Sequence, residues 1–418
     1  MTSPLHDIRV LDFSRVLAGP LCTQYMSDMG ADVVKIESPQ GGDDSRGWPP
    51  FPKRPDGEYF GTPFLAANRG KRSVAIDLKS EQGKDVCRQL AARADVVVES
   101  FGPGVAERLG IDYETLRQIN PRLVYCSISG FGTRGPMKQG KGYDVILQAF
   151  TGMLSITGEP GGNPVRSPFS PVDQATGMHA LIGILAALYE RRETGMGKKI
   201  EASLFDTATG FLGYFLQGYW VRGTEPVPPG NGHESLCPYE VFAASDKAFI
   251  LGVANDNLWR KFCDLAELNA YVDDPRFATN ANRVQHRAET VALVRKAVRQ
   301  HPCAYWIERL DAAGIPCSPL HTLGDLSAHP HTAASEMVRQ YEHPLLGALK
   351  TVSQPLRFDG ERTPLRQHAP MLGEHTQSVL AELGVSQEEI MNMAHRGIVR
   401  MGNAVHQASP TPRTSGNL

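Results

Sequence analysis

The chain has 418 residues, more than one hydrophobic core usually supports, so about two domains are expected. Its content of 41% hydrophobic and 21% charged residues is typical of a globular protein. The 43 basic and 45 acidic residues give a formal net charge of −2. This balance lacks the basic field that binding to nucleic acid or an anionic membrane would need.

The N-terminus does not resemble a targeting segment. Asp7 and Arg9 occupy the stretch in which a signal peptide needs its apolar core. The longest apolar run, 180–189, is about half as long as a membrane span. The seven cysteines form no C-x-x-C pair and are odd in number, which favours reduced thiols. We therefore expect a cytoplasmic protein.

Short apolar runs alternate with helical spacing in the first third of the chain. The runs that we predict to be strands lie at 7–13, 31–36, 73–78, 95–100 and 123–132. Helices are predicted after Gly19-Pro20, closing at Gly30, and from about Ser80 to Ala94. Strands that alternate with helices indicate an α/β fold with a doubly wound, mainly parallel sheet. No G-x-G-x-x-G follows the first strand and no P-loop motif occurs, which argues against dinucleotide and ATP sites of the usual types.

Residues 41–71 are predicted to form a long loop rich in Gly and Pro. The loop contains the cations Arg46, Lys53, Arg54 and Arg69. A loop of this length inside a compact domain is often functional, and a solvated loop is the equal alternative.

A central helix is predicted from about Asp173 to about Thr194. Pro168 and Pro171 keep the preceding residues extended, so the helix is expected to begin after them. Apolar residues at 178, 181, 182, 185 and 188 have the spacing of one core-facing helix side. Asp173 then lies in the first turn, where free N–H groups would keep its carboxylate ionised. The ordinary use of Asp there is an N-cap, which stabilises a helix by ~1 kcal/mol.

The second half of the chain indicates an inserted domain. Residues 203–221 predict a buried helix, and 221–238 are a hinge rich in breakers. Two antiparallel strands around 245–247 and helical segments at 255–268, 287–300 and 303–313 predict a small α+β domain. Strand character returns after about 335. The predicted domains are a large domain at 1–225, the small domain at 226–330, a return to the large domain at 331–400, and a disordered tail at 401–418.

Seven phrases, in register along the chain, resemble one family. They are VLDFSRVLAGPLCTQ (10–24), GADVVKIE (30–37), NRGKRSVAIDLKSEQG (68–83), FGPGVAERLG (101–110), the Asp173 segment ending in TGMGKKIEASLFD, GIPCSP (314–319) and MLGEHT (371–376). Together they resemble the family III CoA-transferases, the CaiB/BaiF family. The resemblance implies a Rossmann-like large domain built from both chain ends, an inserted small α+β domain, and two interlocked subunits.

The resemblance also implies the chemistry. The aspartate at the position of Asp173 would be the nucleophile, attacking an acyl-CoA to form an aspartyl anhydride and then an aspartyl-CoA thioester. No metal and no permanently bound cofactor would be needed, because coenzyme A arrives as part of the substrates. The partners would be an acyl-CoA, a small carboxylic acid and a second copy of the chain.

The family's CoA contacts can be carried over by position. They fall on Val16, Leu17, Ala18, Ile76, Asp77, Leu78, Lys79, Ser100, Phe101, Gly102, Arg108, Lys141, Gly142, Tyr143 and Asp144. For Arg108 and Lys141 a solvated surface charge is the alternative.

Departures from the formyl-CoA transferases affect the expected substrates. Leu17 stands where those enzymes have glutamine, Ser38 where they have arginine, and residues 230–239 replace a tetraglycine flap. With these differences the chain resembles relatives that act on small dicarboxylic or carnitine-like acids. We expect succinyl-CoA or a similar short donor and a small carboxylic, most simply dicarboxylic, acceptor.

Two other functions are considered. The α-methylacyl-CoA racemases of the same family use a histidine where this chain has Tyr143, and an unperturbed tyrosine is a poor base at neutral pH. A CoA-binding protein without catalysis is the second alternative. His233, in the hinge loop, is a candidate contact for a substrate carboxylate or a solvated residue. The pair His329 and His331 has no third metal ligand nearby in the sequence.

Overall fold

The computed structural model describes residues 3–52 and 60–402. Lys53, Arg54 and all but the first two residues of the predicted tail lie outside the described residues. The chain forms two compact units, one made of Met1–Leu147, Ser167–Phe211 and Ser335–Leu418 and the other of Gln148–Arg166 and Leu212–Ala334. The domain ranges that we predicted from the sequence remain a proposal.

The first unit is organised around one mainly parallel sheet. Its strands are β1 (Arg9–Asp12), β2 (Asp32–Glu37), β3 (Arg72–Ile76), β4 (Val96–Glu99), β5 (Val124–Ser129), β6 (Lys199–Ser203) and β12 (Val399–Arg400). They lie in the order β12-β3-β2-β1-β4-β5-β6, and only the β12–β3 pair is antiparallel. The predicted mixed α/β fold is confirmed.

The strand order reverses between β1 and β4, because the chain moves outward from β1 to β3 and then returns to β4. Such a reversal opens a crevice at the carboxyl ends of the two strands, where open α/β sheets bind ligands. The five predicted strands are present. β6 was missed because its first four residues alternate between exposed and half-buried and only Ser203 is buried. β4 is buried along its whole length and begins with an apolar run of three valines.

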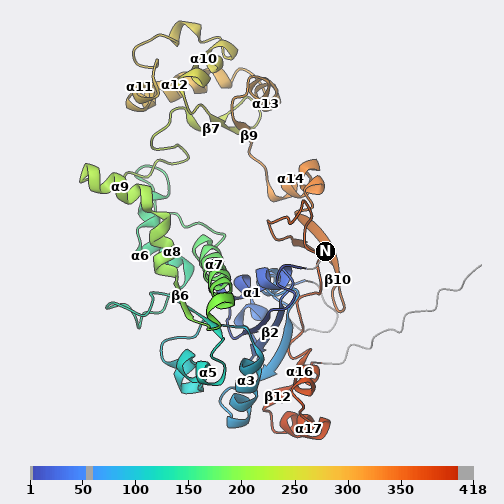
Figure 1. The fold of residues 1–418 in the computed structure, drawn as a ribbon. Coiled ribbons are helices and arrows are strands. Elements are labelled where there is room, and N and C mark those ends of the chain that lie inside the picture. The colour runs from blue at the N-terminus through green and yellow to red at the C-terminus, as the bar shows by residue number, and fades with distance from the viewer. Residues whose placement is uncertain (1–2, 53–59, 403–418) are drawn as a thin grey trace, which may run out of the picture. The chain divides into compact units, whose positions relative to one another are not determined.

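Both ends of the chain contribute to this unit. Helices α16 (Thr376–Glu382) and α17 (Gln387–His395) lead into β12, whose Val399 pairs with Ile76 of β3. The backbone N–H of Ala75 donates to Thr376 Oγ1 at 3.1 Å. Figure 1 draws the red C-terminal helices beside the blue strands and α3.

The remaining elements of the first unit surround the sheet. They are α1 (Ala18–Asp28), the 3-10 helix η1 (Asp44–Gly47), α2 (Thr62–Ala67), α3 (Glu81–Arg93), α4 (Val105–Leu109), α5 (Tyr113–Ile119), α7 (Pro171–Thr194), α8 (Leu204–Phe211) and the hairpin β10 (Val338–His343) with β11 (Gly347–Val352). Helix α6 (Asp144–Phe150) begins in the first unit and ends in the second. The two short helices η1 and α2 interrupt the region 41–71, which we predicted as one continuous loop.

The second unit has its own sheet and core. Strands β7 (Tyr239–Ala243), β8 (Ala248–Gly252) and β9 (Cys317–Pro319) form an antiparallel sheet. Its helices are η2 (Met153–Ile156), α9 (Gly213–Arg222), α10 (Asp256–Leu265), η3 (Asn269–Tyr271), α11 (Asn280–Gln285), α12 (Arg287–Val298), α13 (Cys303–Ala312), α14 (Leu323–Ala328) and α15 (Pro330–Ala334). Trp259, Phe262 and Trp306 pack at its centre. The predicted α+β composition is confirmed.

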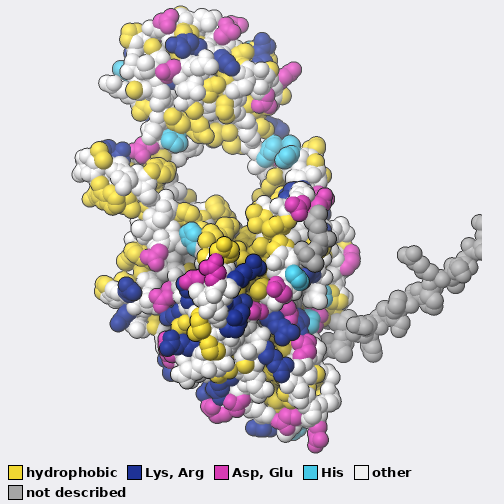
Figure 2. Space-filling view, viewed as in Figure 1, with side chains coloured by type: hydrophobic (Ala, Val, Ile, Leu, Met, Phe, Trp, Pro, Cys, Tyr) yellow, Lys and Arg dark blue, Asp and Glu magenta, His cyan; other side chains and the backbone are white. Residues whose placement is uncertain are grey.

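The predicted buried helix at 203–221 is wrong. The chain forms α8 and α9 instead, with a break at Leu212, and α9 has no buried residue. Tyr214, Trp220 and Val221 are all exposed. Figure 2 shows hydrophobic side chains gathered on the surface of α9. The aromatic residues of this segment therefore did not indicate that it is buried in the described chain.

The part of the chain that the structure describes has no helix that is both long and apolar enough to cross a membrane. All seven cysteines are free thiols, and only Cys317 is even partly exposed.

Candidate active site

A cavity of about 640 Å³ opens at the carboxyl ends of β1, β4 and β5. It is lined by Arg15, Val16, Leu17, Ala18, Gly19, Asp44, Glu99, Ser100, Phe101, Gly102, Pro103, Gly104, Ala106, Glu107, Asp112, Tyr113, Tyr125, Ser127, Ile128, Ser129, Gly130, Phe131, Gly132, Thr133, Lys138, Gln139, Gly140, Lys141, Gly142, Tyr143, Asp173, Lys199 and Leu204. All of these residues belong to the first unit. The cavity thus lies where the reversal of strand order predicts a ligand site.

Asp173 lies in the first turn of α7, at the cavity. The helix begins at Pro171, not after it as we expected, because proline is favoured in the first turn, where its missing N–H is not needed. Ser170 occupies the N-cap position with φ of 52° and makes no side-chain cap. Asp173 is therefore not the N-cap.

The start of α7 is capped by another carboxylate. Asp144 Oδ2 accepts hydrogen bonds from the backbone N–H groups of Val172, at 2.8 Å, and of Asp173, at 3.1 Å. Asp144 itself is buried, with 6% of its surface exposed. The donors that we expected to hold the Asp173 carboxylate are thus partly taken by Asp144.

Burial, as the larger cause, and the negative charge of Asp144 together raise the pKa of Asp173 to about 7. The expectation that the helix N-terminus keeps this carboxylate ionised was therefore wrong at neutral pH and below. Among the described residues, none forms a hydrogen bond or salt bridge with its side-chain oxygens. A carboxylate in this setting is more basic than a solvated one, and a more basic oxygen is a better nucleophile.

A close crossing of two helices places Asp173 near the start of α1. A Cβ atom on Gly177 would lie 2.5 Å from the carbonyl oxygen of Ala18, so only glycine fits there. Asp173 is four residues before Gly177 and therefore on the same face of α7. Leu17 is the N-cap of α1 and gives no side-chain cap. Because first-turn N–H groups have no partner inside a helix, those of Ala18 and Gly19 can serve a ligand in the cavity.

The loop before α6 is fixed by two glycines. A Cβ atom on Gly142 would meet Gly130 Cα at 2.5 Å, and one on Gly130 would meet Gly142 N at 2.6 Å. This backbone contact ties the loop carrying Lys141 and Tyr143 to the end of β5. It also positions Asp144, the first residue of α6, against α7.

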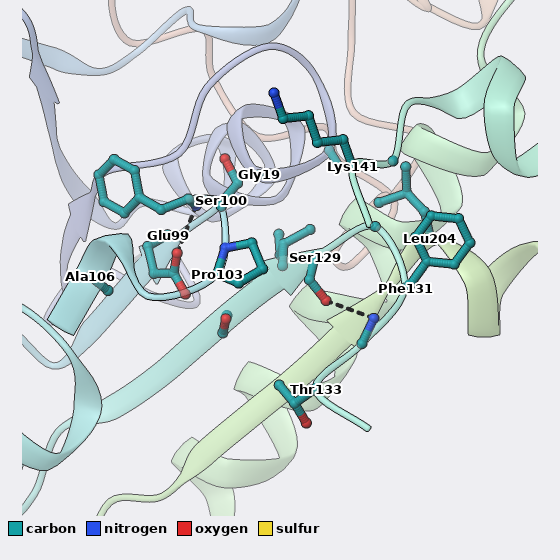
Figure 3. A pocket seen from close by; sticks show the side chains of 18 of the residues that line it. Gly19, Glu99, Ser100, Pro103, Ala106, Ser129, Phe131, Thr133, Lys141 and Leu204 are labelled. Carbon is teal, nitrogen blue, oxygen red and sulfur yellow. Dashed lines mark hydrogen bonds between the residues drawn. The ribbon is translucent and has the colours of Figure 1, made fainter. Parts of the chain in front are cut away.

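Charges of both signs line the cavity. The cations are Arg15, Lys138, Lys141 and Lys199, and the anions besides Asp173 are Asp44, Glu99, Glu107 and Asp112. Burial raises the pKa of Glu99, which accepts a hydrogen bond from the N–H of Phe101 at 2.8 Å. Figure 3 shows Glu99 and Ser129 at the ends of their strands, with Lys141 in the loop above them. Cations of this kind can bind phosphate groups.

The comparisons with known proteins identify the family. The model of CoA-transferase family III matches residues 5–376. This chain belongs to CoA-transferase family III, as the phrases in the sequence indicated. It is therefore a CoA-transferase by family, and the cavity is the candidate active site of this family III enzyme.

Similar proteins cover nearly the whole chain. The succinate–glutarate CoA-transferase of Agrobacterium fabrum is 38% identical over 384 residues, which are 91% of this chain and 96% of that protein. The acetyl-CoA:oxalate CoA-transferase of Acetobacter aceti is 36% identical over 89% of this chain and 93% of its own. The crystal structure of a CaiB/BaiF family protein from Brucella suis has a TM-score of 0.81 and 37% identity, covering 92% of this chain and all of that one.

Most CoA contacts carried over from the family meet in this cavity. Val16, Leu17, Ala18, Ser100, Phe101, Gly102, Lys141, Gly142 and Tyr143 line it, as does the predicted nucleophile Asp173. The others do not. Ile76, Asp77, Leu78 and Lys79 lie at the end of β3 and after it, Arg108 lies in α4, and Asp144 lies beneath α7. Their roles in CoA binding stay predictions.

Several cavity residues were missed by the sequence analysis. Glu99 and Ser129 end strands, and Lys199 begins β6. The position of Glu99 directly after an apolar run was a usable signal, because carboxyl ends of parallel strands meet at one edge of the sheet. Lys199 gave no such signal, since it precedes a strand that we did not predict. His233 lies in the second unit, with its ring edge-on to Tyr239.

Proposed function

We propose that this enzyme moves CoA from succinyl-CoA, or a similar short acyl-CoA, to a small dicarboxylic acid, with Asp173 as the nucleophile. The observation that carries the proposal is the Asp173 carboxylate. It lines the cavity, its pKa is about 7 because of burial first and Asp144 second, and none of the described residues forms a hydrogen bond or salt bridge with its oxygens. A buried carboxylate with these properties suits covalent catalysis better than helix capping.

The proposed reaction has two matched halves. An Asp173 oxygen attacks the thioester carbonyl, the C–S bond breaks, and CoA thiolate leaves behind an acyl-aspartyl anhydride. The thiolate then attacks the Asp173 carbonyl carbon, the anhydride C–O bond breaks, and the donor acid departs from an aspartyl-CoA thioester. The acceptor carboxylate runs the same steps in reverse, so no oxidant, metal or ATP takes part. Each attack is intramolecular within the cavity, which supplies effective molarities of ~10⁵ M or more.

The first turn of α1 supports this chemistry. Each tetrahedral intermediate carries a negative oxygen, and preorganised N–H donors stabilise such an oxygen. The N–H groups of Ala18 and Gly19 start an uncapped helix in the same cavity as Asp173. We assign them the oxyanion site.

The choice of substrates rests on similar proteins and on one cavity residue. A relative named for succinate and glutarate is 38% identical, but a relative named for oxalate is 36% identical, so overall identity does not separate the acids. Leu17 lines the cavity. The sequence resemblance places a glutamine at this position in the formyl-CoA transferases. An apolar side chain there favours an acid with methylene groups over oxalate.

The family's racemase chemistry is the second candidate. It would need a base where Tyr143 stands, and Tyr143 is 59% exposed at the cavity. A phenol is a poorer proton acceptor than the imidazole that the racemases use. A third candidate, CoA binding without catalysis, leaves the raised pKa of Asp173 without a use.

We further propose that the enzyme is an interlocked homodimer in the cytoplasm. Helix α7 has a second apolar stripe in which Met178 is 38%, Ile182 is 62% and Tyr189 is 71% exposed. Figure 2 shows hydrophobic side chains on the surface over α7. Burial of this stripe by a second copy would remove apolar surface from water. Sedimentation at low micromolar protein tests this, since an interlocked pair should show no monomer.

One assay separates the candidates. Purified enzyme is given succinyl-CoA with glutarate, other short dicarboxylic acids, oxalate or a monocarboxylic acid, and acyl-CoA products are followed by mass spectrometry. The proposal expects CoA to move to a dicarboxylic acid. Epimerised acyl-CoA without transfer would favour the racemase, and bound but unchanged acyl-CoA would favour the binding protein.

A further inference from the structure

Val16 has an unusual backbone conformation. Its φ is 74°, in the left-handed region, where a β-branched residue is a genuine outlier. The other described non-glycine residues with positive φ are Ser170, Glu267, Glu336 and Asp359, none of which is β-branched. Val16 lines the cavity and stands two residues before α1. Strain at such a place persists only when the surroundings enforce it.

Buried side chains hold the backbone on both sides of Val16. The N–H of Val16 donates to both Asp43 oxygens, at 3.2 and 3.3 Å. Lys35 Nζ donates to the carbonyl of Ser14 at 2.8 Å and lies 2.9 Å from Asp43 Oδ2. The N–H of Arg15 donates to Ser100 Oγ at 3.0 Å. Three consecutive residues are thus tied to fixed groups.

The two charged side chains at the centre of this arrangement are fully buried. Burial acts to raise the pKa of Asp43, but the Lys35 ammonium and hydrogen bonds from Ser45 outweigh it and lower the pKa to about 2. Both groups therefore stay charged at neutral pH. A buried ion pair is weak evidence for stability, because hydrophobic replacements are often neutral or stabilising. A use other than stability therefore has to be sought for this pair.

We propose that the Lys35–Asp43 pair is a positioning device for CoA transfer, which holds Val16 in the left-handed region and so keeps the first turn of α1 facing the cavity. Neither residue lines the cavity, so both act through the loop. The inference rests on the proposed function, because it takes the α1 turn to contact the reacting acyl group.

A double variant removes the Lys35–Asp43 pair, here called the clamp, without leaving either partner as an unpaired charge. In Lys35→Met/Asp43→Leu the loop loses both holders, and Val16 relaxes toward an ordinary φ. We expect kcat/KM for the acyl-CoA donor to fall at least about tenfold, with kcat falling more than KM rises, since the interaction lost is with the transition state. Activity within about twofold of wild type in the folded variant would overturn the proposal.

Adding Val16→Gly to that double variant gives the decisive comparison. Glycine takes positive φ without strain, so the loop can regain its shape without the clamp. We expect kcat/KM to recover at least about threefold, beyond the effect of Val16→Gly alone in the wild-type background. If the pair had only a structural role, kcat/KM would not recover in this way. The absence of recovery would therefore overturn the proposal.

The control uses an ion pair whose cation is buried but whose carboxylate is partly exposed. Arg283 and Asp256, in the second unit, are joined at 2.9 Å with the Arg283 side chain fully buried. Arg283→Met/Asp256→Leu is expected to lower the unfolding temperature, and Val16→Gly should restore nothing in that background. Recovery there would show that the glycine acts generally, which also overturns the proposal.

Amide hydrogen exchange of the wild-type enzyme decides the question even if the variants do not fold. Peptides covering 13–18 should already be protected in the free enzyme and change little when CoA is added. Rapid exchange that slows only with CoA would mean that the ligand, not the clamp, orders the loop. A wild-type protein with a protected loop but without CoA transfer would instead remove the proposed function and leave the clamp standing.

Discussion

The carboxylate of Asp144 accepts hydrogen bonds from the N–H groups of both Val172 and Asp173, at 2.8 and 3.1 Å. It thereby caps α7, which carries the nucleophile, and places a negative charge beside that nucleophile. The two effects act together, because donors directed at Asp173 itself would lower its pKa and weaken its attack. Asp144 uses those donors and leaves Asp173 basic.

Replacement of Asp144 by asparagine separates capping from charge. Asn keeps an oxygen that accepts from both N–H groups, so the helix start should survive. The loss of the negative charge should lower the pKa of Asp173, although burial, the larger cause of the raised pKa, remains. The acidic limb of the pH profile of kcat/KM should move to lower pH by about half a unit or more. An unmoved limb would show that Asp144 does not tune the nucleophile.

Asp173→Asn should stabilise the enzyme at high pH. The pKa of Asp173 is raised when folded, so the folded state holds this proton more tightly, and the stability that it contributes is lost as pH rises from about 4 through about 7. The variant lacks this titration. It should unfold like wild type near pH 4 and be more stable at pH 8, by up to ~4 kcal/mol. Denaturant melts at both pH values measure the gap, and a gap that does not change with pH would contradict the raised pKa.

Gly142→Ala should damage the site through the backbone. The new Cβ would lie 2.5 Å from Gly130 Cα and 2.9 Å from Leu147 Cδ2, and such overpacking typically costs about 1–3 kcal/mol. Because the loop carries Lys141 and leads into Asp144, kcat/KM should also fall. Gly210→Ala is the control, since its Cβ would have nothing within 4 Å. Equal behaviour of the two variants would show that the glycine contact is not needed.

Lys141→Ala tests the cationic side of the cavity. If the ammonium contacts a CoA phosphate, KM for donor and acceptor thioesters should rise several-fold with kcat nearly unchanged, the pattern of lost uniform binding. Arg108→Ala should behave alike if the family's contact holds, although Arg108 does not line the cavity. Lys198→Ala is the control, because that exposed ammonium pairs with Glu190 and does not line the cavity. An unchanged KM would show that Lys141 is a solvated surface charge without a role in CoA binding.

Local patterns predicted the strands and helices that are buried along their length. β4 reads as an unbroken apolar run and is buried throughout, whereas β6 is polar and half-exposed and was not predicted. For α7 the spacing of apolar residues predicted the helix but only part of its buried face, since Leu181 and Leu188 are buried as expected. Met178 and Ile182 are exposed, and the buried face includes Thr176, Gly177 and Ala180. A helix with apolar residues on two sides cannot be oriented from periodicity alone.

The site was predicted as far as its chemistry is local. Asp173 could be placed in a first turn because a helix start is marked by neighbouring residues. The cap by Asp144 could not be predicted from pattern, since those hydrogen bonds span 28 and 29 positions. The left-handed Val16 also has no signal, because its conformation depends on Asp43, which lies 27 positions away. Only the fold brings these residues together.

Trapping the covalent intermediate tests the central claim most directly. Wild-type enzyme is incubated with acyl-CoA and hydroxylamine, then digested and analysed by mass spectrometry. Because an aspartyl anhydride or thioester reacts with hydroxylamine, the account predicts inactivation that depends on acyl-CoA and a hydroxamate on residue 173, with neither in Asp173→Asn. CoA transfer at a substantial fraction of the wild-type rate by Asp173→Asn, with deamidation excluded by mass, or a hydroxamate on another residue, would contradict it.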